Sequence, residues 1–128
     1  MYKTFNELAN GSNRVSATRA LQAWQYLVAK ATNRQIVRYN DLSRLIGYTD
    51  NRPLGVILDC VMSYCKENDL PPLTINVVNQ KGIPGKGFSA ESLEDFRQRR
   101  EDVFCFDWFS IVPPTADELH HARVNSSN

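Results

Sequence analysis

Hydrophobic side chains spaced by three and four residues predict an amphipathic helix over residues 16–32. The apolar positions of this stretch are Ala17, Ala20, Leu21, Trp24, Leu27, Val28 and Ala31. Polar residues occupy the other positions, so one face of the helix is expected to pack on a core. Ser16 is a suitable N-cap residue. We therefore expect a scaffold helix in which Trp24 anchors the core.

The next segment, residues 36–88, alternates between strand-like and helical patterns. Residues 35–38 can form a short strand. A brief helix follows, with its N-cap at Asn40 or Asp41 and its end at Gly47. Pro53 suits the first position of a second helix, which is expected to end near Asn68.

The same segment then changes to a β pattern. Residues 73–78, with the sequence LTINVV, are rich in β-branched side chains and predict a strand. Residues 83–88 are rich in Gly and Pro, which suits the return of a wing or an edge loop. Strand, helix, turn, helix and β wing are the parts of a winged helix-turn-helix.

The remaining segments are expected to support this unit. Residues 89–104 predict a fourth helix, and the apolar segment 105–112 should pack on the core as a strand. A capping box at residues 115–118 predicts a short last helix. Residues 1–15 are expected to be a loosely ordered lead-in and residues 124–128 a frayed tail. The predicted fold is α+β: one mainly helical winged helix-turn-helix domain over residues 1–128, with a small β wing.

Composition and charge narrow the class of protein. The chain has 128 residues, of which 42% are hydrophobic and 23% charged, which is typical of one globular domain. It contains no apolar run long enough to span a bilayer and no signal-peptide pattern, so we expect a cytoplasmic protein without membrane contact. Residues 1–55 include eight basic and three acidic residues, whereas residues 56–128 include seven basic and eleven acidic residues. This balance permits nucleic-acid binding.

No residue pattern predicts catalysis, a metal or a cofactor. The cysteines Cys60, Cys65 and Cys105 lack metal-ligand spacing, and we interpret them as structural. His120 and His121 are adjacent, so both cannot easily bind one metal from a helix. No phosphate-binding loop occurs, and no Ser or Cys has a nearby His to activate it. The sequence therefore predicts a protein that is not an enzyme.

Several short motifs in residues 36–88 belong to a known pattern. They are Val37-Arg38-Tyr39-Asn40-Asp41-Leu42, Ile46-Gly47, Arg52-Pro53-Leu54-Gly55, Val77-Val78 and the glycines Gly82, Gly85 and Gly87. In these motifs the chain resembles the DNA-binding domain of O6-alkylguanine-DNA alkyltransferases and their alkyltransferase-like relatives. The pattern LPPLT…VVN…G.PG.GF over residues 70–88 also resembles the core of a group of small prokaryotic or phage-borne winged-helix proteins, which suggests a bacterial or phage accessory protein.

The resemblance implies roles for particular residues. Tyr39 would turn a nucleotide's phosphate, and Arg52 would enter the vacated base stack. Gly55 would let its helix approach the minor groove closely. With neighbouring and wing cations included, the expected DNA-binding residues are Arg38, Tyr39, Arg44, Arg52, Gly55, Lys81 and Lys86.

Two departures from the family limit what the resemblance implies. The segment that should hold a reactive Cys and a His reads Leu73-Thr74-Ile75-Asn76, which excludes alkyl transfer by the family's mechanism. The second helix also carries Asp59 where a groove-facing residue is expected, and an acid there opposes phosphate binding.

Each proposed contact has a structural alternative. Tyr39 could pack on the short helix, Arg52 could pair with Asp50, and the wing lysines could keep an edge soluble. Two functions therefore remain open. The first is a non-enzymatic protein that binds or senses double-stranded DNA. The second is a protein-interaction module, such as a regulatory or anti-defence factor, that binds a partner or a second copy of itself through aromatic residues. Those residues are Phe104, Phe106, Trp108 and Phe109.

Overall fold

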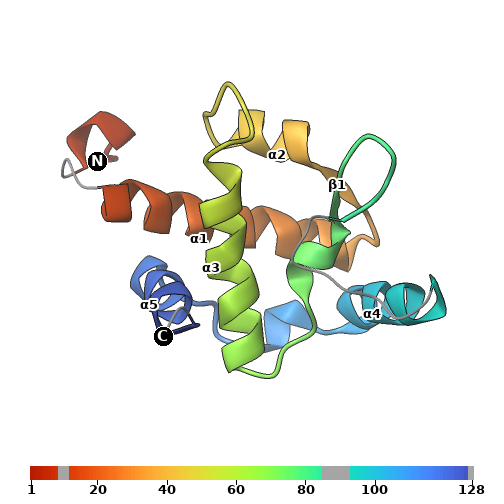
Figure 1. Cartoon of the computed structure of the whole chain (residues 1–128). Helices are drawn as coiled ribbons and strands as arrows, with labels where there is room; N and C mark the ends of the chain where they lie inside the picture. Colours follow the sequence, from red (N-terminus) through yellow and green to blue (C-terminus); the bar gives the residue numbers. More distant parts are fainter. Residues whose placement is uncertain (9–11, 85–92, 127–128) are drawn as a thin grey trace.

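Three helices that lie far apart in the sequence pack on one another and form the body of the protein (Figure 1). They are α1 (Ser12–Thr32), α3 (Leu54–Glu67) and α5 (Ala116–Ser126). The structure is a computed structural model and describes residues 1–8, 12–84 and 93–126. Within these residues no helix is both long enough and apolar enough to cross a membrane.

The core is centred on α1, as its periodicity predicted. Trp24 is 2% exposed and meets Tyr64 and Trp108 edge to face, with ring centroids 5.5 and 5.6 Å apart. Trp24 is therefore the core anchor that we expected. The helix begins at Ser12, four residues before the predicted cap at Ser16. The start was misplaced because Arg14 and Val15 continue the helix without contributing to its buried stripe.

The expected loose lead-in contains local structure. Phe5–Glu7 form a 3-10 helix, and the Thr4 amide donates a hydrogen bond of 3.3 Å to Glu7 Oε2. The guanidinium of Arg19 lies over the Phe5 ring, 3.4 Å from its centroid. This cation–π contact fixes the segment on α1.

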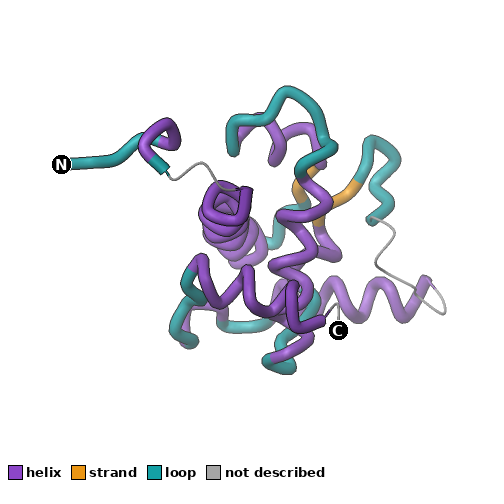
Figure 2. The backbone as a smooth tube through the Cα atoms, turned by 60° about the vertical axis from the view of Figure 1, so that its left-hand side comes forward, coloured by secondary structure: helices purple, strands orange, loops and turns teal. Residues whose placement is uncertain are grey.

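A small parallel sheet joins the two ends of the segment that we expected to be a helix-turn-helix. Strand β1 (Val37–Arg38) pairs with β2 (Val77–Val78) in the register Val37↔Val77 and Arg38↔Val78. Helix α2 (Tyr39–Leu45) follows β1 directly. Its N-cap is Arg38, which makes no side-chain capping bond, so the predicted caps at Asn40 and Asp41 are wrong. The chain is thus mostly helical with one two-stranded sheet in the described residues (Figure 2).

The predicted strand over residues 73–78 is wrong in its first four positions. Leu73–Asn76 form a 3-10 helix, η2, which the Ile75 amide closes by donating to the Pro72 carbonyl at 2.9 Å. All four side chains are buried, because η2 contacts α1, α3 and α4 together. A tight helical turn can bury side chains on several sides, whereas a strand presents only two faces. Only Val77 and Val78 form a strand.

Gly47 ends α2, as predicted. Its φ of +90° is in the left-handed region, and the Tyr48 amide donates to the Ser43 carbonyl at 2.9 Å. The Gly47 amide donates to Arg44 O at 3.1 Å. These two bonds form a Schellman motif, which turns the chain toward α3.

Gly47→Ala is expected to lower the free energy of unfolding by about 1–2 kcal/mol, because an L side chain rarely adopts this φ. A Cβ atom would also lie 2.7 Å from Arg19 Nη2, which must then shift. Gly55→Ala is the matched control, since no atom lies within 4 Å of its added Cβ. Gly55 lies inside α3, so its replacement should stabilise by up to about 1 kcal/mol. Urea denaturation measures the stability of both variants. Equal effects of the two substitutions would contradict the claim that the positive φ of Gly47 requires a glycine.

The C-terminal third matches the predicted helices but not the predicted strand. Helix α4 runs over Leu93–Cys105, and a 3-10 helix, η3, covers Trp108–Ser110 where we expected a strand. The capping box is confirmed: the Glu118 amide donates to Thr115 Oγ1, and the Thr115 amide donates to Glu118 Oε1, both at 3.1 Å. Helix α5 continues to Ser126, beyond the expected start of a frayed tail at Val124.

Candidate nucleic-acid interface

A surface groove lies between the start of α2 and the turn that follows β2. It has a volume of about 340 Å³ and contains three of the predicted DNA-binding residues, Arg38, Tyr39 and Arg44. The register of the small sheet brings these segments together, because Arg38 is paired with Val78. The other lining residues are Asn40, Asp41, Asn51, Val78, Asn79 and Gln80.

A second hollow of about 430 Å³ adjoins the first and shares Asn40, Arg44 and Asn51 with it. Its further lining residues are Ser43, Tyr48, Thr49 and Asp50. Two hydrogen bonds tie its two sides together: Asn51 Nδ2 donates to Asn40 Oδ1 at 2.7 Å, and Ser43 Oγ donates to the Asp50 carbonyl at 2.6 Å. Because of the shared residues we treat both hollows as one surface, called the α2 groove.

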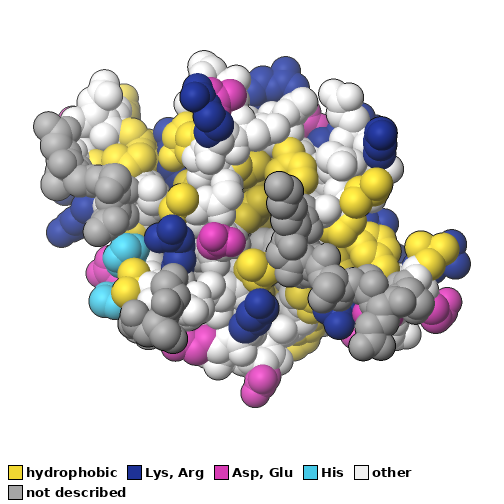
Figure 3. All heavy atoms as spheres, in the orientation of Figure 1, with side chains coloured by type: hydrophobic (Ala, Val, Ile, Leu, Met, Phe, Trp, Pro, Cys, Tyr) yellow, Lys and Arg dark blue, Asp and Glu magenta, His cyan; other side chains and the backbone are white. Residues whose placement is uncertain are grey.

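Cations follow the rim of the α2 groove. Dark-blue side chains gather along the upper part of the molecule, over α2 and the loop that enters α3 (Figure 3). Arg44 Nη2 lies 3.4 Å from Asp41 Oδ1, and both side chains are exposed. A pair of this kind stabilises little, so Arg44 remains available for a ligand.

Arg52 stands beside the groove in a two-point contact with Asp50. Its Nε and Nη2 atoms lie 3.2 and 2.9 Å from the two carboxylate oxygens, and its side chain is 89% exposed. The structural alternative that Arg52 pairs with Asp50 is therefore confirmed. These hydrogen bonds, with one from the Arg52 amide, lower the pKa of Asp50 to about 2.

This contact predicts an unusual titration. The Asp50 carboxyl should titrate near pH 2, and in Arg52→Gln its pKa should rise toward the ordinary 3.8. Because the pKa of Asp50 is lowered in the folded state, its contact with Arg52 stabilises the fold above about pH 4. This stabilisation is lost as the pH falls toward 2. Carboxyl ¹³C NMR over this pH range measures the effect. An unchanged midpoint in Arg52→Gln would show that Arg52 does not hold the carboxylate.

The turn after β2 forms the other wall of the groove. Asn79 Oδ1 accepts hydrogen bonds from the amides of Lys81 and Ile83 at 2.8 and 3.1 Å, and an antiparallel bridge joins Val78 to Pro84. Lys81 is exposed in this turn, next to the groove residue Gln80. Lys86, the other predicted wing contact, lies outside the described residues.

The two predicted α3 positions lie outside the groove lining. Gly55 is exposed in the first turn of α3, with open space where a Cβ would be. Asp59 is exposed about one turn further along the helix. The first turn itself contains no acid. The groove-forming helix is therefore α2, and no residue of α3 is among the described residues that line the groove.

The aromatic segment near the end of α4 is mostly turned inward. Trp108 is 3% exposed, and Phe106 packs on it with ring centroids 4.6 Å apart. Phe104 is half-buried and lies beneath the Arg34 guanidinium. Phe109 alone of the four aromatic residues is highly exposed, at 72%. The expectation that this segment packs on the core is thus confirmed for Trp108 and Phe106.

The cysteines lie apart from the groove. Burial raises the pKa of the Cys65 thiol to about 11 and also raises that of Cys60. Both thiols therefore stay protonated and pack as apolar groups. The exposed Cys105 donates to Glu101 Oε1 at 3.5 Å. Across the described residues no group of three His, Cys, Asp or Glu side chains is placed to hold a metal ion.

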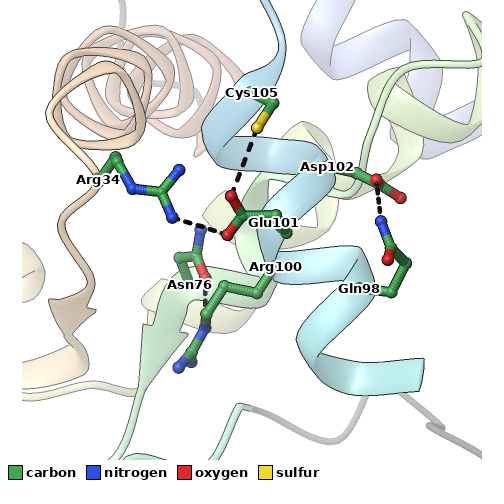
Figure 4. Close-up of polar contacts among 7 residues, drawn as sticks. All are labelled: Arg34, Asn76, Gln98, Arg100, Glu101, Asp102 and Cys105. Carbon is green, nitrogen blue, oxygen red and sulfur yellow. Dashed lines mark hydrogen bonds and ion pairs between the residues drawn. The ribbon is translucent and has the colours of Figure 1, made fainter. Parts of the chain in front are cut away.

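A polar cluster between η2 and α4 was not recognised in the sequence. Arg100 Nε donates to Asn76 Oδ1 at 2.8 Å, and Asn76 is only 3% exposed (Figure 4). The sequence contained one signal: Arg100 occurs in the inward stripe of α4, four residues after Phe96 and three before Val103. Its partner could not be found without the turn that buries Asn76.

A scan against models of known protein families, a search of curated proteins and a search of solved structures found no match to this chain.

Proposed function

We propose that this protein is a non-enzymatic DNA-binding protein that contacts double-stranded DNA through the α2 groove. In this proposal α2 and α3 act as a helix-turn-helix, and the turn after β2 acts as the wing. One observation carries the proposal: Tyr39, to which the resemblance assigns a contact with a nucleotide, opens onto one groove together with the neighbouring cations Arg38 and Arg44.

The chemistry of the groove suits a nucleic acid. Arg38 and Arg44 supply positive charge for phosphates. Amide side chains supply both donors and acceptors, which can bond phosphate oxygens and base edges. These amides are Asn40, Asn51, Asn79 and Gln80.

The local charge also favours an anionic partner. The groove and its flanks carry the cations Arg38, Arg44, Arg52 and Lys81 and the carboxylates Asp41 and Asp50. Each carboxylate is held by a neighbouring arginine at 3.4 or 2.9 Å, so neither projects alone toward a phosphate. The excess of positive charge is small, and it supports binding that salt weakens strongly.

A fluorescence-anisotropy titration of a labelled DNA duplex tests this proposal. We expect a dissociation constant of about 1 μM or lower at 50 mM salt and at least about tenfold weaker binding at 200 mM salt. Tyr39→Phe, which keeps the half-buried ring, separates the role of the hydroxyl from that of packing. Absence of binding at 50 mM salt would overturn the proposal.

One observation favours a second function, that of a protein-interaction module. Phe109 and Val112 are 72% and 86% exposed, and only two residues separate them. Exposed apolar side chains of this size are a feature of contact surfaces. Under this function the chain would bind no duplex but would self-associate in sedimentation velocity, and Phe109→Ser would restore the monomer.

A further inference from the structure

The loop between α2 and α3 holds the Arg52 guanidinium by one of its edges. Arg52 Nε lies 3.2 Å from Asp50 Oδ1, and Nη2 lies 2.9 Å from Oδ2. The Arg52 amide also donates to Oδ1, at 2.9 Å. A two-point contact fixes the orientation of the guanidinium plane as well as its distance, which a single bond does not.

Asp50 is itself held in place by α2. Its carbonyl accepts from Ser43 Oγ at 2.6 Å, and Ser43 is only 2% exposed. The next residue, Asn51, donates to Asn40 Oδ1 at 2.7 Å. An exposed ion pair usually contributes little because it must order two mobile side chains, whereas here the loop that carries the carboxylate is already tied to a helix. The carboxylate is therefore a fixed support for Arg52.

The other edge of this guanidinium is free. A guanidinium has five N–H donors, of which the contact with Asp50 uses one on Nε and one on Nη2. The donors on Nη1 and the second donor on Nη2 make no hydrogen bond or ion pair with any of the described residues. The Arg52 side chain is 89% exposed, so a large partner can reach it. Nη1 and Nη2 thus offer two parallel donors to two neighbouring acceptors.

This free edge lies beside the α2 groove. Asp50 lines the groove, and its carboxylate is 2.9 Å from Arg52 Nη2. Arg52 also comes two residues before α3 begins at Leu54. In a helix-turn-helix, residues at the N-terminal end of the second helix contact base edges. DNA offers two neighbouring acceptors at each phosphate group and at the O6 and N7 atoms of guanine.

We propose that Asp50 is a positioning residue that orients Arg52, so that its Nη1–Nη2 edge binds a pair of neighbouring acceptor atoms on DNA. This inference rests on the proposed function and adds how one arginine recognises the duplex. The contact is made by hydrogen bonds from the outer edge of Arg52, which differs from entry into a base stack. Because Asp50 balances the charge of Arg52, the pair contributes through its geometry more than through net charge.

The sign of one substitution tests this role. Asp50→Asn removes an acid from the groove, yet we expect it to weaken duplex binding about 3–10-fold, because Arg52 loses its support. The asparagine oxygen can still accept from the Arg52 amide, so the turn should be retained. Fluorescence anisotropy at about 100 mM salt, where long-range charge effects are screened, measures the change.

Asp41→Asn is the matched control. Asp41 also lines the groove, but it meets Arg44 at a single point, 3.4 Å away, and so does not fix a guanidinium plane. Its replacement should tighten binding about twofold, as removal of an acid near phosphates normally does. An Asp50→Asn chain that binds as tightly as the Asp41→Asn chain would overturn the inference.

A double-mutant cycle separates positioning from a merely structural role. In the Arg52→Gln background, Asp50→Asn should no longer weaken binding, because no guanidinium remains to be oriented. A loss of affinity that persists in this background would also overturn the inference.

A modified duplex identifies the acceptors. Replacement of guanine by 7-deazaguanine removes the N7 acceptor and leaves the phosphate charge unchanged. If Arg52 binds guanine, this duplex should bind the unaltered chain and the Asp50→Asn chain equally. If Arg52 binds a phosphate, the difference between the two chains should remain.

NMR in the absence of DNA tests the orienting contact by itself. The Arg52 Nε–H should exchange with water more slowly in the unaltered chain than in Asp50→Asn, and equal rates would contradict the positioning role. The two proposals fail in different ways. If the unaltered chain binds no duplex, the proposed function fails and this inference fails with it. If the chain binds and Asp50→Asn tightens the binding, only the positioning role fails.

Discussion

Trp108→Ala is expected to lower the free energy of unfolding by about 3–5 kcal/mol. The indole is 3% exposed and contacts Trp24 and Phe106 edge to face, so its removal leaves a cavity beside the α1 core. Its Nε1–H also donates to the Val103 carbonyl at 2.8 Å. Alanine would leave that buried acceptor without this donor, which adds to the cost.

Urea denaturation followed by circular dichroism measures this loss, since the change in midpoint reports stability at constant slope. Phe109→Ala is the matched control. Phe109 directly follows Trp108 and is also aromatic, but its side chain is 72% exposed. Its replacement should change stability by less than about 0.5 kcal/mol. Similar effects of the two substitutions would contradict the inward position of Trp108.

The double charge reversal Arg38→Glu/Arg44→Glu is expected to weaken DNA binding about 100-fold at low salt. Both arginines open onto the α2 groove, and Arg44 is more than two-thirds exposed, so the substitutions disturb no core contact. Two attractions to phosphates become repulsions, and the dependence of affinity on salt should become correspondingly shallower. Anisotropy titrations of one duplex at several salt concentrations measure both effects.

Lys66→Glu is the control for this reversal. Lys66 is exposed near the C-terminal end of α3, whereas the loop that borders the groove precedes the N-terminus of that helix. It should change affinity by less than about threefold, through net charge alone. If one reversal at Lys66 weakens binding as much as the double variant, the groove is not the contact surface. Melting curves of each variant confirm that the fold is retained.

The sequence predicted those features that depend on neighbouring residues. The stripe in residues 16–32 predicted the buried face of α1, because helical geometry brings every third and fourth residue to one side. Gly47 and the Thr115–Glu118 capping box marked helix ends, because their bonds span at most five residues. The loop from α2 into α3 and its Arg52–Asp50 contact were also local enough to be foreseen.

Features set by distant contacts were predicted poorly. The β-branched segment at residues 73–78 suits a strand, but packing against three helices coils Leu73–Asn76 into η2. Trp108 and Phe109 are adjacent aromatic residues, and local sequence does not show which one enters the core. We expected the segment to pack on the core, and the tertiary structure decided which residue does so. Trp108 is buried because α1 provides Trp24 beside it, whereas Phe109 stays exposed.

For the candidate site, the sequence by itself determined the residue types: cations, a tyrosine and amides that can bind an anionic partner. Only the tertiary structure decided which of them share a surface. The pairing of Arg38 with Val78 joins segments forty residues apart, and it brings Asn79 and Gln80 to the α2 groove. Arg100 and Asn76 likewise meet only because α4 packs on η2. The sequence specifies the chemistry of each side chain, whereas packing between distant segments decides which side chains come together at one site.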